Sequence, residues 1–404
     1  MSVLEKILAP ISRDDFFQNY YEKKPLYIPR GPTSKFNNLP DIEKFEELLW
    51  LNESKLERIL RVNKKGSYRQ IPHHASGKDT FRWAVDSFSD GYTLILNGTD
   101  HLSKEIARIA RSIEEETNSK VAANAFMTPA NSRGFMPHFD THDVFILQLE
   151  GRKHWSLYDQ REVLPLDRQI YLVNQESVNA PKLEYTLEAG DLLYIPRGML
   201  HGPYTTDQPS LHLTMGYRPL RWRDYLMAMV DIISENDSRF RESIRSSNVA
   251  PSHQEIEKVL NLFSQESSSP HVHKLAFERV REKFVSQLRA LPGGHIKSLD
   301  GLSEITAETG FIRREDCICH ISETVDSVRL QFPGIGLASS DDLHPGCIEA
   351  PIAAGGAFRF IASVKGEFKI KDLPEILTEQ TRIELLKKLV KEGLLITTNN
   401  SDMN

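Results

Sequence analysis

Cysteine is scarce in this chain, and it occurs only near the C-terminal end. The three cysteines among 404 residues are Cys317, Cys319 and Cys347, a set that fits a reducing compartment better than a disulfide framework. Together with His320 and His344 they suggest a zinc cluster, but their spacing is not that of a common zinc module. We therefore expect free thiols and no structural zinc.

Export signals and long apolar runs are also missing. The opening residues MSVLEKILAPISRDDFF carry acidic side chains where a signal peptide needs an apolar run, and no stretch approaches membrane-spanning length. A net charge of -6 and a pI near 6.2 argue against a protein that mainly coats nucleic acid or acidic membranes, yet they allow a basic peptide partner. We expect a soluble, cytoplasmic protein with no membrane and no direct nucleic-acid partner.

Several catalytic signatures are absent as well. The chain has no G-x-x-x-x-G-K-[ST] or G-x-G-x-x-G phosphate-binding pattern and no G-x-S-x-G elbow. Nucleotide-binding and serine-hydrolase functions therefore lose support.

The pattern of the chain changes along its length. Residues 1–91 mix amphipathic helices, expected over 41–51 and 53–62, with a turn-rich segment, and form a lead-in. Residues 92–220 hold short β-rich runs separated by Gly, Pro and Asp, which indicates a sandwich or barrel. These runs are TLILNG, KVAANAFMT, DVFILQLEG, KHWSLY, DLLYIP and LHLTMGYR.

The pattern becomes helical after Pro219. Apolar side chains recur with helical spacing from Trp222 to Ile233, and the stripe continues until Pro292, so residues 221–292 are expected to form an all-α module. Residues 293–404 alternate strand-like and helical pieces, and Thr378 and Gly393 are expected to cap and stop the last helix.

The most informative motif is His138-Phe139-Asp140. On a strand, residues two apart point the same way, so this pair presents an imidazole and a carboxylate to the inside of a barrel. His201 follows the run DLLYIPRGML and is the candidate third ligand. Two imidazoles and one carboxylate on one face of an iron leave positions open for a co-substrate and dioxygen, which suits an oxygenase.

Three further residues are candidate co-substrate contacts. Lys153 lies in a strand-like run after an expected turn at 150–152, and it would pair with the far carboxylate of a dicarboxylic acid. Asn124 and Thr214 would add hydrogen bonds. Each also has an ordinary structural reading, as a solvated lysine, a turn amide or a strand threonine.

Other histidines near these motifs are set aside. Strand parity is expected to place some of them on the opposite sheet face, and the pair His73-His74 lies in a loop without a partner carboxylate. The set comprises His73, His74, His142, His154 and His212.

The string NAFMTPANSRGFMPHFDTHDVFILQLEGRKHWSLY, followed by GDLLYIPRGMLHGP and HLTMGYR, resembles the ribosomal oxygenase family of cupin-fold, JmjC-type hydroxylases. The resemblance also covers the lead-in FFQNYYEKKPLYIPR and is looser toward the C-terminus. It implies a mainly β core, a double-stranded β-helix of the cupin/JmjC type. An all-α dimerisation module would follow over 221–292, and an α+β winged-helix-like domain over 293–404.

The resemblance also implies a chemistry. Fe(II) would be held by His138, Asp140 and His201, with 2-oxoglutarate chelating the metal and O2 as oxidant. Lys153 would anchor the distal carboxylate, although family members carry Lys or Arg there. Asn124 and Thr214 would assist. The implied reaction is hydroxylation of a His or Arg side chain of a ribosomal protein by a homodimer.

Alternatives stay open at this point. The same chemistry acting on a biosynthetic peptide or small natural product is the first. A non-catalytic, nucleic-acid-associated cupin/winged-helix adaptor is the second, and the acidic chain weakens it. A metal-binding cupin isomerase or storage-type barrel is the third, but it leaves Lys153 without a purpose.

Overall fold

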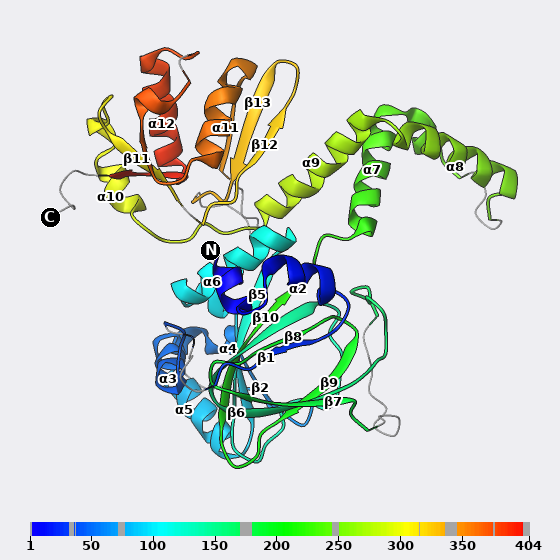
Figure 1. Ribbon diagram of the computed structural model, residues 1–404, viewed down its shortest axis with the longest axis vertical. Coiled ribbons are helices and arrows are strands. Elements are labelled where there is room, and N and C mark those ends of the chain that lie inside the picture. Colours follow the sequence, from blue (N-terminus) through cyan, green and yellow to red (C-terminus); the bar gives the residue numbers. More distant parts are fainter. Residues whose placement is uncertain are drawn as a thin grey trace. The chain divides into compact units, whose positions relative to one another are not determined.

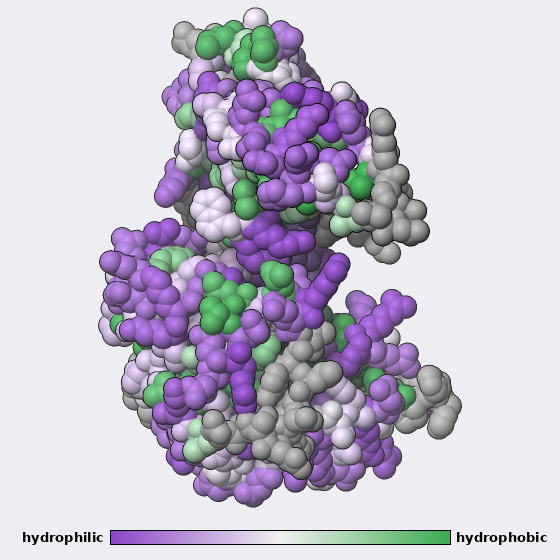
Figure 2. All heavy atoms as spheres, turned by 90° about the vertical axis from the view of Figure 1, so that its right-hand side faces the viewer, coloured by the Kyte–Doolittle hydropathy of each residue, from purple (hydrophilic) through white to green (hydrophobic). Residues whose placement is uncertain are grey.

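The chain forms two compact units, residues 1–219 and 220–404. The computed structural model describes residues 2–31, 36, 38–71, 77–169, 180–244, 250–314, 316–335, 346–374 and 376–398. Within these ranges, no helix combines the length and the apolarity needed to cross a bilayer. Figure 2 shows a mostly hydrophilic face with separate hydrophobic patches.

The first unit is built on a ten-stranded sheet in which every pairing is antiparallel. The strand order is β1-β8-β6-β10-β5-β4-β2-β3, and β7 and β9 pair with β6 off this path. Figure 1 shows these strands curving round an interior, with helices outside. The strands are β1 Leu26–Ile28, β2 Leu60–Lys64, β3 Ser67–Tyr68, β4 Thr93–Asn97, β5 Val121–Thr128, β6 Asp143–Gln160, β7 Leu183–Glu188, β8 Leu192–Ile195, β9 Met199–Tyr204 and β10 Ser210–Tyr217.

Strand β6 joins the two parts of this sheet. Its first half pairs with β8 and β10, and its second half pairs with β7 and β9. The turn predicted at 150–152 is therefore wrong, because one strand of 18 residues runs through it. Gly151 has a φ of 66°, and a Cβ there would lie 1.9 Å from the carbonyl oxygen of Pro209, so the kink requires glycine.

The helices of the first unit confirm one prediction and contradict another. The helix predicted over 41–51 is α3, Ile42–Leu51, capped by Asp41. The helix predicted over 53–62 is wrong, since it breaks into a 3-10 turn, the short α4 Leu56–Ile59 and β2. Leu60 and Val62 flank the exposed Arg61 and are buried in the sheet beside β4, so strand pairing overrides helical spacing. The remaining helices are α1 Val3–Leu8, α2 Arg13–Asn19, α5 Gly77–Ser89 and α6 Lys104–Thr117.

The second unit begins with three helices, α7 Trp222–Asn236, α8 His253–Ser267 and α9 Pro270–Ser286, as the helical spacing predicts. Two three-stranded sheets follow, with orders β15-β11-β16 and β12-β13-β14. Thr378 caps α12 and Gly393 has a φ of 84° just after it, as predicted. The other elements are α10 His295–Asp300, β11 Gly310–Arg313, β12 His320–Glu323, β13 Ser327–Phe332, β14 Gly346–Pro351, α11 Gly355–Ser363, β15 Glu367–Lys369, α12 Glu379–Lys391 and β16 Leu395–Thr398.

Each unit has its own apolar core. In the first unit, α1, α2, α3 and α6 bury leucine, isoleucine and phenylalanine side chains against one face of the sheet. A second, smaller cluster lies between the two halves of β6 and includes Trp155, Leu187 and Leu193. In the second unit, α11 and α12 cover the small sheets around Phe311, Phe358 and Leu386. The core of the first unit fixes the curvature of the strands that carry the candidate site.

Candidate metal centre and co-substrate pocket

The segment His138–Asp140 lies just before β6. His138 forms an isolated antiparallel bridge with His201 of β9, in which the N–H groups of His138 and His201 each donate to the other's carbonyl, at 2.9 and 2.8 Å. The prediction that the pair lies within a strand is wrong, because the pairing is limited to this single bridge and Pro137 has no N–H to extend it. The bridge nevertheless sets the two imidazoles side by side.

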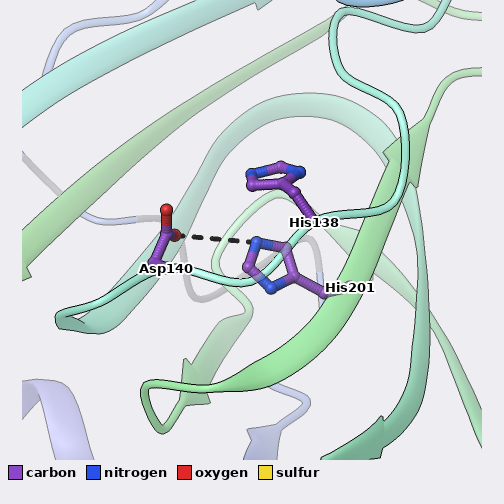
Figure 3. A group of neighbouring side chains, drawn as sticks. All are labelled: His138, Asp140 and His201. Carbon is purple, nitrogen blue, oxygen red and sulfur yellow. Dashed lines mark ion pairs between the residues drawn. The ribbon is translucent and has the colours of Figure 1, made fainter. Parts of the chain in front are cut away.

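Three side chains converge at this point (Figure 3). One ligand atom from each of His138, Asp140 and His201 can be chosen so that all lie within 4.8 Å of one another. The His201 Nε2 lies 3.7 Å from Asp140 Oδ2, and the two imidazole centroids are 4.6 Å apart. In the described part of the chain, this is the single group of three His, Cys, Asp or Glu residues with such spacing.

Backbone carbonyls determine which imidazole nitrogen faces the cluster. The Nδ1 of His138 lies 2.8 Å from the carbonyl oxygen of Met136, and the Nδ1 of His201 lies 3.0 Å from that of Met199. A carbonyl only accepts hydrogen bonds, so each Nδ1 carries the hydrogen and donates it. Each Nε2 is then left with a free lone pair, which is the form that binds a metal ion.

The charges of the cluster suit a cation. Burial, together with the neighbouring His138, lowers the pKa of His201 to about 4, so its ring is neutral at physiological pH. Burial alone would raise the pKa of Asp140, but His142, His138 and His201 hold it below its usual value. A neutral imidazole and an ionised carboxylate are the protonation states that metal binding needs.

The three side chains open into a cavity of about 310 Å³. Strands β5, β6 and β10 supply half of its lining residues. Its lining residues are Tyr68, Thr93, Asn124, Phe126, Thr128, Gly134, Phe135, His138, Asp140, His142, Val144, Ile146, Lys153, Trp155, His201, Pro203, His212 and Thr214.

Lys153 lies inside this cavity and is 2% exposed. Its Nζ donates a hydrogen bond to Thr128 Oγ1 at 2.7 Å. Within the ranges that the structure describes, no carboxylate lies within ion-pair distance of this ammonium group. Burial lowers the pKa of Lys153 to about 7. A buried cation without an anion is costly, so the group is arranged to receive an anionic ligand.

Asn124 and Thr214 also line the cavity and are direct partners across β5 and β10. The side-chain oxygen of Asn124 accepts a hydrogen bond from the N–H of Gly98 at 3.1 Å. This contact fixes the amide orientation and leaves its NH2 group available to a ligand.

Thr128 and Trp155 line the cavity but were not singled out by the sequence analysis, and His212, which was set aside there, lines it too. Thr128 accepts the hydrogen bond from Lys153, and His212 stacks on Phe126 with ring centroids 4.9 Å apart. Trp155 meets His212 edge to face. The alternation of side chains along a strand could have identified these lining residues from the sequence. Thr128 shares a strand face with Asn124, Trp155 shares one with Lys153, and His212 shares one with Thr214.

The histidines that were set aside divide into two groups. His142 and His212 line the cavity, although neither belongs to the three-residue metal group. Setting aside His154 agrees with the structure, because its ring lies next to the hydroxyls of Thr186 and Thr206. His73 and His74 lie outside the described residues.

The cysteines confirm the expectation of free thiols. Cys317 is buried, Cys319 is half-buried and Cys347 is exposed, and none forms a disulfide. His344 lies outside the described residues.

Comparisons with known proteins agree with this geometry. The JmjC domain family matches residues 98–225. Ribosomal oxygenase 1 of Danio rerio is 30% identical over 247 residues, which cover 59% of this chain and 45% of that protein. The bifunctional lysine-specific demethylase and histidyl-hydroxylase NO66 of Culex quinquefasciatus is 30% identical over 427 residues, covering 95% and 64%. The chain thus spans less than two thirds of these relatives.

Solved structures show the same fold. The Escherichia coli protein ycfD has a TM-score of 0.57 at 18% identity, covering 96% of this chain and 99% of that one. A structure of this ribosomal oxygenase in complex with cobalt and 2-oxoglutarate has a TM-score of 0.55 at 18% identity, with the same coverage. The predicted cupin-type core with a large antiparallel sheet is therefore confirmed. The sequence matches agree with the resemblance that the sequence suggests: residues 98–225 match the JmjC domain family, and the chain is similar to proteins named ribosomal oxygenase.

Proposed function

We propose that this protein is an Fe(II)- and 2-oxoglutarate-dependent oxygenase that hydroxylates a His or Arg side chain of a ribosomal protein. The observation that carries the proposal is the convergence of His138, Asp140 and His201 beside a cavity that contains the unpaired ammonium of Lys153. A storage protein or a simple metal-binding barrel has no use for a buried lysine facing that cavity.

The donor set fits iron. Two imidazole Nε2 atoms and one carboxylate oxygen make the facial triad of non-haem Fe(II) oxygenases. The carbonyls of Met136 and Met199 hold both imidazoles in the required tautomer. When bound, the metal and 2-oxoglutarate would supply the oxidising chemistry, and O2 would be the oxidant.

The cavity also fits 2-oxoglutarate. Lys153 would hold the distal carboxylate, and Thr128, which already accepts the lysine's hydrogen bond, would orient the ammonium. Asn124 and Thr214 would contact the same ligand from β5 and β10. Trp155 Nε1 is buried and lacks a hydrogen-bond partner, so a ligand oxygen would satisfy it. The Escherichia coli relative was solved with cobalt and 2-oxoglutarate, which supports this assignment.

The cavity wall would serve the reaction in two further ways. Phe126, Phe135 and Val144 line the cavity with apolar groups, and the ring centroid of Phe135 lies 5.4 Å from that of His138, which would keep water away from the reacting centre. Tyr68 is exposed where the cavity reaches the surface, so a peptide side chain would enter past it. The residues of the chain thus bind, orient and shield, and positioning decides which C–H bond is hydroxylated.

A ribosomal protein is the substrate that the relatives favour, since their names include ribosomal oxygenase and histidyl-hydroxylase. Mass spectrometry of ribosomal proteins from cells with and without the gene tests this. We expect a one-oxygen gain on one His or Arg. No gene-dependent gain on any of them favours the alternative, a biosynthetic peptide or small natural product.

An anaerobic titration tests the chemistry separately. Fe(II) plus 2-oxoglutarate should produce a charge-transfer absorbance with the wild-type protein, and His201→Ala should abolish it. His154→Ala is the matched control, because this imidazole lies outside the cavity and contacts Thr186 instead. Absence of the absorbance in the wild type would refute the proposed function.

The wider organisation belongs to the same proposal. We propose a lead-in over 1–91, a catalytic domain over 92–220, a helical dimerisation module over 221–292 and a winged-helix-like domain over 293–404, acting in the cytoplasm without direct nucleic-acid contact. Exposed apolar side chains on α7–α9 support a homodimer. They are Trp222, Leu226, Met227, Val230, Ile256, Val259, Leu260 and Phe277. Light scattering should give a dimer, and Leu260→Glu should weaken it.

A further inference from the structure

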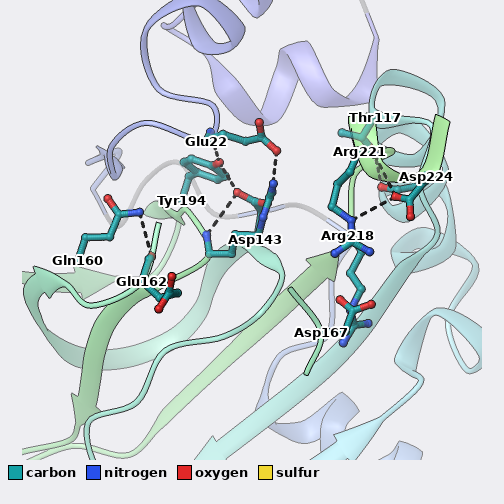
Figure 4. Close-up of polar contacts among 12 residues, drawn as sticks. Glu22, Thr117, Asp143, Gln160, Glu162, Asp167, Tyr194, Arg218, Arg221 and Asp224 are labelled. Carbon is teal, nitrogen blue, oxygen red and sulfur yellow. Dashed lines mark hydrogen bonds and ion pairs between the residues drawn. The ribbon is translucent and has the colours of Figure 1, made fainter. Parts of the chain in front are cut away.

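A guanidinium group is buried between two carboxylates close to the metal-ligand residues. Arg197 is 4% exposed, and its NH1 group lies 2.6 Å from both Asp143 Oδ2 and Glu22 Oε1. The hydroxyl of Tyr194 donates to Asp143 Oδ1 at 2.7 Å and accepts a hydrogen bond from the N–H of Glu22 at 2.9 Å. Figure 4 shows Glu22, Tyr194 and Asp143 of this network close together.

The network joins three segments that are distant in sequence. Glu22 belongs to the N-terminal segment between α2 and β1, and Asp143 is the first residue of β6. Tyr194 lies in β8, and Arg197 lies in the turn between β8 and β9. Two of these segments carry the metal ligands, because Asp140 precedes Asp143 by three residues and His201 follows the turn.

Backbone hydrogen bonds transmit the position of this turn to the ligands. The N–H of Gly198, directly after Arg197, donates to the carbonyl oxygen of Asp140 at 2.9 Å. The N–H of Arg197 reaches Asp143 Oδ1 at 3.4 Å. Gly198 cannot carry a side chain, since its φ is 83° and a Cβ would lie 1.9 Å from the carbonyl oxygen of Glu162. A displacement of Arg197 would therefore displace the backbone of Asp140.

Stability alone does not account for this network. Burial raises the pKa of Asp143, and the opposing attraction of Arg197 does not cancel it, so the carboxylate is partly uncompensated. Arg197 Nε is buried without a hydrogen-bond partner. Buried ion pairs of this kind commonly stabilise a protein no more than apolar residues of the same size do. The planar guanidinium group, in contrast, forms hydrogen bonds in fixed directions and so specifies one geometry. The network is better explained by the geometry that it imposes.

We propose that Arg197 is a positioning residue of the metal centre, which ties Glu22 and Asp143 to the turn before His201 and so sets the distance between Asp140 and the two imidazoles. This inference rests on the proposed function, because it assumes that the three side chains bind a metal ion. It assigns to the N-terminal segment a part in metal binding, although none of its residues lines the cavity.

The test measures Co(II) affinity by calorimetry, with the full chain at a temperature where circular dichroism shows every variant folded. Arg197→Met should raise the Kd for Co(II) about tenfold or more, which is the usual cost of losing a partner outside the ligand shell. Glu22→Gln should raise it by several-fold, because one carboxylate contact is lost while Asp143 remains.

A buried pair elsewhere in the same unit supplies the matched control. Glu114 accepts hydrogen bonds from Arg111 Nε at 2.9 Å and from the N–H of Val121 at 3.0 Å. Glu114→Gln should lower the melting temperature and leave the Kd for Co(II) unchanged. If Arg197 has only a structural role, Arg197→Met should give the same result as this control, a lower melting temperature with an unchanged Kd for Co(II).

The outcomes separate the two proposals. Co(II) binding by the wild type, with both variants within about twofold of its Kd, would overturn the positioning role and leave the proposed function standing. No Co(II) binding by the wild type would overturn both. If Arg197→Met does not fold, the Kd of Glu22→Gln for Co(II) tests the positioning role instead. Glu22 is half-buried, and its replacement by glutamine removes a charge without leaving a cavity.

Discussion

Replacing Lys153 by methionine should stabilise the ligand-free protein while abolishing its affinity for 2-oxoglutarate. The ammonium group is buried without an anion, and burial lowers its pKa from 10.5 to about 7. At about 1.4 kcal/mol per pKa unit, that fall corresponds to an upper limit of about 5 kcal/mol of destabilisation by the charged lysine. Methionine has a similar length and no charge, so it fills the same space without this cost.

The sign of the pH dependence follows from the same numbers. Between pH 7 and 10.5 the unfolded chain keeps the lysine proton and the folded chain has lost it, so the unfolded state binds more protons. The free energy of unfolding of the wild type should therefore rise with pH across this window through the Lys153 contribution. The advantage of Lys153→Met should be greatest near pH 7 and vanish near pH 10.5.

Calorimetric melting of both proteins between pH 7 and 10 measures this difference. Lys182→Met is the control, because Lys182 is largely exposed and pairs with Asp159. With Co(II) present, saturating 2-oxoglutarate should raise the melting temperature of the wild type and leave that of Lys153→Met unchanged. A variant that is no more stable than the wild type at pH 7, or whose advantage does not depend on pH, would refute the reasoning.

The other predictions concern the ligands and one turn. His138→Ala should weaken Co(II) binding by more than the roughly 10–100-fold that loss of an outer partner costs, as measured by calorimetry. Asn124→Ala should raise the Kd for 2-oxoglutarate about tenfold and leave the Kd for Co(II) unchanged, which is the value of one charge-assisted hydrogen bond. Gly198→Ala should lower the free energy of unfolding by at least about 2 kcal/mol in urea titration. Gly31→Ala, with φ 71° and nothing within 4 Å of its Cβ, should cost only about 1 kcal/mol. Equal losses for the two glycine variants, or unaltered binding in the ligand variants, would contradict these expectations.

The parts of the fold that the sequence could predict are those with strong local patterns. The helical spacing from Trp222 to Ile233 and the cap at Thr378 lead to α7 and α12, because neither depends on distant partners. The segment 53–62 has helical spacing too, yet Leu60 and Val62 belong to β2. Their state is decided by pairing with β4, which no local pattern contains.

Some residues of the candidate site could be predicted from the sequence, and others could not. His138, Asp140 and His201 carry a chemical type and a spacing that single them out, and the structure brings them together. Thr128 has neither, and its contact with Lys153 depends on the curvature of the sheet. His212 lines the cavity on the same strand face as Thr214, a position that strand parity relative to Thr214 predicts.

The orientation of the two imidazoles is encoded in the main chain. The groups that receive their Nδ1 hydrogens are the peptide oxygens of residues 136 and 199, which every amino acid possesses. The identity of the side chains at these two places therefore does not decide how the rings face the ion. A saturation library at both positions should return many active sequences, whereas one at 138 or 201 should return almost none.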